Sequence, residues 1–168
     1  ARTRVVWLLA PVLAATLTVN VLHVFQGTLE SVVTLALFIP LLIGTGGNTG
    51  AQSATTVVRA MALGEVRFRD LPTVVFREAR VGLLLGGMLG VLALLPVSVF
   101  VGRQIALVVA ITLLVICLFA ASAGALLPML ARRVGIDPAI VSAPLITTLV
   151  DATGLVVYFL VARIVLGL

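Results

Sequence analysis

Long apolar runs separated by short polar stretches dominate the chain and predict five membrane-crossing helices. The expected crossings cover residues 5–24, 29–62, 81–101, 104–131 and 138–166, and a glycine-rich polar segment interrupts the second. A helix needs about 20 largely apolar residues to cross a bilayer, and each run reaches that length. The runs do not alternate as barrel strands do, so helices satisfy their backbone polar groups. The predicted fold is an all-α polytopic membrane protein, with residues 1–168 forming one transmembrane domain.

Composition supports this interpretation, because 62% of the residues are hydrophobic, 10% are charged and the mean hydropathy is +1.33. A soluble domain cannot cover that much apolar surface with polar groups. The net charge of +5 does not indicate nucleic-acid binding, because the arginines sit at segment ends and no basic stripe is interleaved with stacking aromatics. One cysteine, Cys117, allows no disulfide framework or thiolate cluster within one chain, and we expect it to be buried.

The arginines instead predict the orientation in the membrane. With a cytoplasmic N-terminus, nine of them fall inside and two, Arg103 and Arg163, fall outside. Such a bias toward the cytoplasmic loops is the usual topology signal. Five crossings then place the C-terminus outside.

Small residues predict where these helices pack. Gly82, Gly86 and Gly90 recur every four residues in the third crossing, and a run of alanine, serine and glycine covers residues 120–125 in the fourth. Small residues allow close helix approach in membranes, so we expect both to be packing surfaces.

Asp151 is the first polar feature that needs a functional explanation, because it lies near the middle of the fifth crossing. A charged carboxylate at that depth costs at least about 2.5–3.5 kcal/mol, and such residues normally face a water-filled path or a partner. Thr147 and Thr148 precede it by four and three residues and share its helical face. Together they predict a hydrophilic stripe along a pore. The alternative is a protonated, hydrogen-bonded structural aspartate.

The second feature is the segment at residues 40–53, PLLIGTGGNTGAQS, within the second crossing. Proline lacks a backbone donor and glycine tolerates bent geometry, so we expect helix breaks at Pro40 and Gly44, and another at Pro144. Backbone carbonyl and amide oxygens, together with a carboxylate, are the hard ligands that Mg²⁺ and Ca²⁺ prefer. The candidate pore-lining or outer-sphere residues here are Gly46, Gly47, Asn48, Gly50 and Gln52. The glycines lack the Lys-Ser/Thr ending of a P-loop, so no nucleotide or other organic cofactor is expected.

These residues resemble the transmembrane domain of the MgtE family of magnesium channels. The likeness rests on Gly46-Gly47-Asn48-x-Gly50-x-Gln52, supported by Pro144-x-x-x-Thr148-x-x-Asp151. It implies a homodimer whose second and fifth helices line the ion path, with Asp151 of each subunit at a central Mg²⁺ site. Family members carry N-terminal cytosolic regulatory domains, and we expect this chain to be the pore domain without them. The resemblance also implies a prokaryotic plasma membrane.

The predicted function is conduction of hydrated Mg²⁺, with Mg²⁺ as the transported and bound ion and with lipid, divalent cations and a second copy as partners. An enzyme is not expected, because an intramembrane aspartyl protease would need a second intramembrane Asp. The open alternative is a proton- or sodium-coupled divalent-cation transporter, which also uses an intramembrane acid and broken helices.

A weaker hypothesis concerns the cytoplasmic side, where Glu78 and Asp137 are possible cation ligands. They could hold cations near the inner mouth or bridge to the regulatory domains through Mg²⁺. Ordinary pairing with neighbouring arginines is the alternative, since exposed charges commonly pair weakly.

Overall fold

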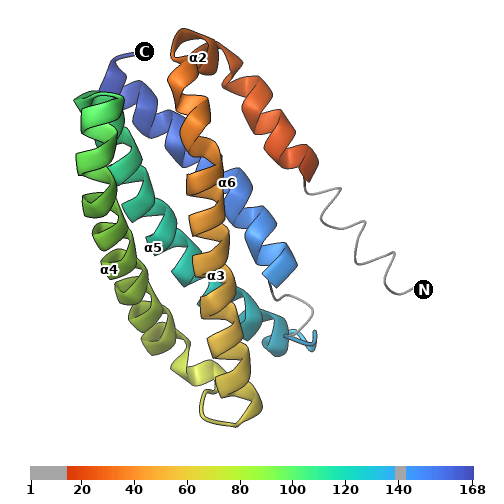
Figure 1. The fold of residues 1–168 in the computed structure, drawn as a ribbon. Coiled ribbons are helices and arrows are strands. Elements are labelled where there is room, and N and C mark those ends of the chain that lie inside the picture. The colour runs from red at the N-terminus through yellow and green to blue at the C-terminus, as the bar shows by residue number, and fades with distance from the viewer. Residues whose placement is uncertain (1–14, 139–142) are drawn as a thin grey trace.

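Helices form the whole of the regular structure in residues 15–138 and 143–168, the parts of the chain that the computed structural model describes (Figure 1). A helix over Ala15–Val24 leads into α2 (Gln26–Ser31) and the 3₁₀ helix η1 (Val33–Phe38). The following elements are α3 (Ile39–Ala62), the 3₁₀ helix η2 (Phe68–Asp70), α4 (Leu71–Phe100), α5 (Arg103–Arg133) and α6 (Ala143–Leu166). The predicted all-α class is confirmed.

Four helical stretches are long and apolar enough to cross a membrane, namely Val33–Ala62, Phe68–Phe100, Arg103–Arg133 and Leu145–Leu166. They correspond to the second to fifth predicted crossings. The first predicted crossing begins at Val5, so its first ten residues lie outside the described residues. Its described part, Ala15–Val24, is a shorter apolar helix. A fifth crossing therefore stays a prediction.

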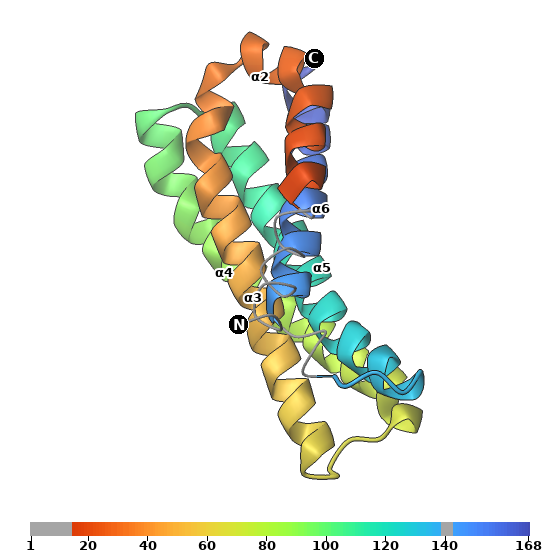
Figure 2. The ribbon, with the colours of Figure 1, turned by 90° about the vertical axis from the view of Figure 1, so that its right-hand side faces the viewer.

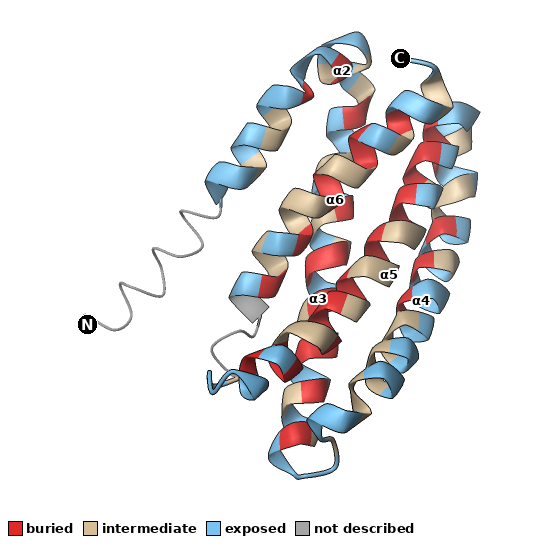
Figure 3. Cartoon of the chain, turned by 180° about the vertical axis from the view of Figure 1, so that it is seen from behind, coloured by how far each residue is buried: buried red, intermediate tan, exposed pale blue. Residues whose placement is uncertain are grey.

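The central helix is α5, which packs against α3, α4 and α6. Most of its inward-facing side chains are fully buried, whereas α4 exposes large apolar side chains on its outer face (Figure 3). Leu95 and Phe100, for example, are 73% and 85% exposed. In a protein that crosses a membrane, this outer face of α4 suits contact with lipid.

The glycine repeat in α4 brings it against the α5 backbone, as the spacing predicts. A Cβ added at Gly82 would collide with the Cys117 carbonyl oxygen, and one at Gly90 would lie 2.9 Å from the Ala110 carbonyl oxygen. On the other side of α5, a Cβ at Gly124 would collide with the Gly50 carbonyl oxygen of α3. Both predicted packing surfaces are confirmed.

Buried polar groups on these surfaces are hydrogen-bonded. Ser53 of α3 donates to the Ala121 carbonyl oxygen at 2.8 Å. Thr49 donates to the Thr45 carbonyl oxygen at 2.8 Å and contacts the sulfur of Cys117 at 3.8 Å. Cys117 itself is buried, as predicted.

Polar and aromatic contacts hold the C-terminal end of α6 to the segment before α3. Arg163 Nε donates to the Thr28 hydroxyl at 2.9 Å, and its guanidinium lies 4.7 Å from the centre of the Phe25 ring. Tyr158 donates its hydroxyl hydrogen to the Leu35 carbonyl oxygen at 2.9 Å. These contacts lie at the end of the bundle opposite the α3–α4 turn (Figure 2).

The expected helix breaks are not found where they were predicted. Helix α3 continues without interruption through Gly44, and the change from 3₁₀ to α geometry falls between Phe38 and Ile39. Pro40 lies in the first turn of α3, where its missing N–H has no intrahelical acceptor to lose. Pro144 is likewise the second residue of α6. The prolines therefore mark helix starts, and packing against α5 and α6 keeps the glycine segment helical.

Two boundaries also differ from the predicted ones. Helix α4 begins at Leu71, ten residues before the predicted entry at residue 81, so the charged residues Arg77, Glu78 and Arg80 belong to the same helix. Helix α6 begins at Ala143, whereas the fifth crossing was predicted from Pro138. Pro138 lies in a turn, and residues 139–142 lie outside the described residues.

Candidate ion-binding site

Asp151 lies in the middle of α6, against α3 at Gly47. A Cβ added at Gly47 would lie 3.5 Å from Asp151 Oδ1 and 3.4 Å from Thr147 Cγ2. Thr147 precedes Asp151 by one helical turn, so both side chains meet the same part of α3. Asp151 and Thr147 are both half-buried. These are ordinary van der Waals distances, so the Asp151 carboxylate lies close beside α3 at Gly47 without crowding it.

The face of α3 next to Gly47 is polar and exposed. Asn48 and Gln52 are one turn apart, and Thr55 and Thr56 extend the row toward the end of the helix. These four side chains, with Ala51, line a shallow hollow on the surface. We call Asn48, Gln52, Thr55 and Thr56 the polar strip of α3.

The hydroxyl groups of the strip are already engaged with the helix backbone. Thr55 donates to the Ala51 carbonyl oxygen at 2.8 Å, and Thr56 donates to the Gln52 carbonyl oxygen at 3.0 Å. Their hydroxyl oxygens still accept hydrogen bonds, and the amides of Asn48 and Gln52 both donate and accept. The strip therefore suits water or a hydrated ion better than lipid.

The three glycines of α3 that were predicted to line the pore fall into two groups. A Cβ at Gly46 would collide with Ile116, and one at Gly50 would lie 2.8 Å from Ile146 Cγ2. Gly46 and Gly50 therefore lie in buried helix contacts rather than on the exposed strip. Gly47 lies at the border between the packed face and the strip.

The structure thus brings Asp151, Thr147 and Gly47 together, and Gly47 directly precedes Asn48 of the polar strip. Thr148 is half-buried next to Thr147 on α6. Sequence reasoning missed Thr55 and Thr56, although their positions seven and eight residues after Asn48 are the signal for a shared helical face.

The acidic residues near the α3–α4 turn do not form one cluster. Within residues 15–138 and 143–168, no three Asp, Glu, His or Cys side chains gather as metal ligands. Glu78 is half-buried on α4, and Asp137 is exposed after the end of α5. Their role as cation ligands stays a prediction. A cation bound at either residue would need further oxygen ligands from water or from other chains.

Comparisons with known proteins place the chain in one family. The MgtE family model, described as a divalent cation transporter, matches residues 39–161. The magnesium transporter MgtE of Thermus thermophilus is 46% identical over 97% of this chain and 36% of its own length. The proteins of that name from Bacillus subtilis and Enterococcus faecalis are 32% and 31% identical, over 95% and 96% of this chain and again 36% of their own lengths. The chain therefore spans about a third of the length of these relatives. The matched residues include Asp151, Gly47 and the polar strip, and the chain belongs to the MgtE family of divalent cation transporters.

Proposed function

We propose that this chain forms half of a magnesium-conducting pore, with Asp151 of two copies at its central ion site. The observation that supports it is the place of the Asp151 carboxylate, which lies against α3 at Gly47, the residue directly before Asn48 of the polar strip. An acid at mid-membrane next to exposed amide and hydroxyl groups is the arrangement expected beside a water-filled path.

Ligand number favours a second copy. Mg²⁺ requires six oxygen ligands in octahedral geometry, and it commonly keeps several of its waters and takes one or two carboxylates. One chain offers one carboxylate at this depth. Two copies related by a two-fold axis would offer two, whose combined charge balances that of the ion and favours divalent over monovalent cations. Asn48, Gln52 and Thr148 would then hold the water shell through hydrogen bonds.

The exposure of the polar strip also favours a second copy. A helix that crosses a membrane does not turn a row of amides and hydroxyls toward lipid without cost, because lipid offers these groups no hydrogen bonds. A second copy facing the strip would enclose a polar path between two α3 helices. Lipid would then contact the apolar outer face of α4.

Orientation follows from the arginines. Seven of the nine described arginines lie toward the end of the bundle that holds the α3–α4 turn, six of them in α3, η2, α4 or α5 and Arg67 in the turn itself. We therefore propose that this end faces the cytoplasm and that the C-terminus lies outside. The regulatory domains that the family resemblance implies would act at the same cytoplasmic end.

Uptake into proteoliposomes tests the proposal. With the membrane potential clamped by a potassium gradient and valinomycin, we expect Mg²⁺ uptake that follows the potential and is unchanged when a proton or sodium gradient is imposed or removed. A Mg²⁺ ionophore added at the end confirms that the vesicles are sealed. Uptake that requires a proton or sodium gradient at fixed potential would instead support a coupled transporter.

The polar strip gives a second prediction. Replacing both Asn48 and Gln52 by Leu removes amides that we assign to the ion's water shell, and we expect the uptake rate to fall about tenfold, since each hydrogen bond contributes about 0.5–1.5 kcal/mol. The stability of one chain should change little, because both side chains are exposed. The matched control is Gln104→Leu, an exposed amide at the start of α5. Equal uptake by the double variant and the control would remove the strip from the ion path.

A further inference from the structure

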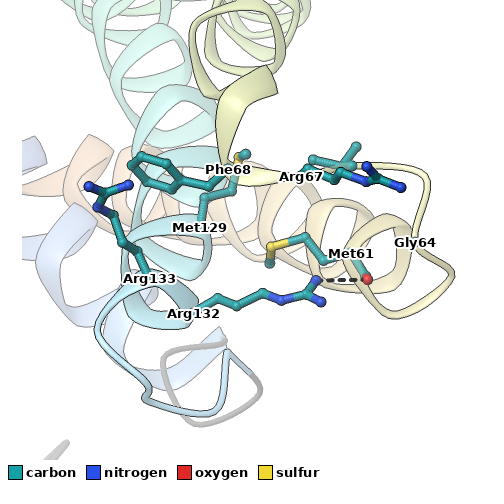
Figure 4. Close-up of a pocket in the computed structure, with 8 residues that line it drawn as sticks. Met61, Gly64, Arg67, Phe68, Met129, Arg132 and Arg133 are labelled. Atoms are coloured by element: carbon teal, nitrogen blue, oxygen red, sulfur yellow. Dashed lines mark hydrogen bonds between the residues drawn. The ribbon is translucent and has the colours of Figure 1, made fainter.

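Three arginines line a pocket at the end of the bundle where α3 turns into α4 (Figure 4). Its volume is about 280 Å³, and Arg67, Arg132 and Arg133 share its wall with Met61, Phe68 and Met129. No carboxylate is among the described residues that line it. The ion path proposed above does not use this pocket.

Two of the three guanidinium groups are held in place by the protein. Arg132 Nη1 donates to the Met61 carbonyl oxygen at 2.8 Å, which links the end of α5 to the end of α3. This bond uses one of the five N–H donors that a guanidinium carries. Arg133 stacks over the Phe68 ring, with 4.3 Å between Cζ and the ring centre. Guanidinium N–H bonds lie in the plane of the group, so stacking leaves its donor edges available.

Asp70, three residues after Arg67, is engaged elsewhere. Asp70 Oδ2 accepts the Arg67 backbone N–H at 2.9 Å, and its Oδ1 lies 3.8 Å from Arg69 Nε. The Arg67 side chain lines the pocket and adds a positive charge to its wall. Three positively charged side chains share the wall of this pocket, so it attracts an anion more strongly than a neutral group.

The place of the pocket indicates which anion it binds. It lies at the ends of three helices that are long and apolar enough to cross a membrane, which is the depth of the lipid headgroups. Basic pockets between transmembrane helices on the cytoplasmic side are suited to phosphate-bearing headgroups, and arginine binds phosphate through two parallel hydrogen bonds. The methionines and Phe68 provide an apolar wall for the glycerol and the first acyl carbons. A volume of 280 Å³ suits one headgroup rather than a folded protein segment.

We propose that this pocket binds the phosphate group of an anionic phospholipid, with Arg132, Arg133 and Arg67 supplying the positive charge that attracts it. Bound there, the lipid would contact the end of α3, the start of α4 and the end of α5 at once. The site would tie the α3–α4 turn to α5 at the membrane surface.

Native mass spectrometry of the purified protein tests this proposal by titration with short-chain phosphatidylglycerol, short-chain phosphatidylcholine and inorganic phosphate. We expect phosphatidylglycerol to bind at least about tenfold more tightly than the other two, since charge-assisted hydrogen bonds are the strong ones. The double variant Arg132→Gln, Arg133→Gln should lose about tenfold or more of that affinity. Arg103→Gln, at the opposite end of α5, should bind as the wild type does.

Several results would contradict the binding of an anionic phospholipid. Equal phosphatidylglycerol binding by the wild type and the double variant would overturn the proposal, as would equal binding of phosphatidylcholine. Tighter binding of inorganic phosphate would assign the pocket to a free anion. Tighter binding of a hexaglutamate peptide, titrated in the same way, would assign it to an acidic protein segment. If the double variant does not purify as folded protein, Arg67→Gln provides the same comparison, because that side chain is exposed.

Discussion

We expect Asp151→Asn to lower Mg²⁺ uptake by about 10- to 100-fold, because a hydrogen bond to a charged group contributes about 1.5–3 kcal/mol and the variant removes that charge. The substitution keeps the shape of the side chain and its contact with Gly47, so packing between α3 and α6 should survive. In the proposed homodimer both carboxylates are lost at once. The pore then lacks the negative charges that would balance a divalent ion at mid-membrane. The measurement is potential-driven uptake into proteoliposomes with a Mg²⁺-sensitive dye.

The control for Asp151→Asn is Glu30→Gln, which neutralises an exposed carboxylate at the end of the bundle opposite the α3–α4 turn. It changes the net charge by the same amount, so it separates a local effect from a general electrostatic one. Melting temperatures of both variants show whether the fold is intact. An Asp151→Asn protein that melts and transports like the wild type would identify Asp151 as a neutral structural residue, and the ion site would have to lie elsewhere.

The sequence was sufficient to predict the all-helical class and the four long apolar helices. Apolar runs of membrane length require helical backbone, and the spacing of Thr147 and Asp151 places both on one face of α6 whatever the rest of the fold does. The sequence also predicted that Gly82, Gly86 and Gly90 form a packing surface, because residues four apart lie on the same face of a helix.

The role of each glycine in α3 could not be predicted in the same way. Glycine suits an unwound backbone and close helix packing equally well, and the choice depends on what stands opposite. Gly46 and Gly50 face Ile116 and Ile146, whereas Gly47 faces Asp151. Those partners lie on α5 and α6, about 70 to 100 residues away in sequence. An interior glycine costs a helix roughly 1 kcal/mol relative to alanine, and the close contacts offset that cost in α3.

Two adjacent glycines in α4 test the packing argument directly. A Cβ added at Gly86 would lie 2.7 Å from Leu114 Cα and 2.8 Å from the Leu113 carbonyl oxygen. Both are backbone atoms of α5, which cannot move aside as the end of a side chain can. We expect Gly86→Ala to push α4 away from α5 and to lower the free energy of unfolding by about 3 kcal/mol, the upper part of the usual range for overpacking.

The matched control for Gly86→Ala is Gly87→Ala, one residue further along the same helix. A Cβ there would lie 3.7 Å from Leu114 Cδ1, an ordinary contact with the end of a flexible side chain. Alanine costs less backbone entropy than glycine in a helix, so this variant should gain about 0.5–1 kcal/mol. Denaturant titration in detergent micelles measures both changes. The two variants add the same methyl group to neighbouring residues, so opposite signs would show that the contact with the α5 backbone requires glycine at residue 86, and equal effects would contradict it.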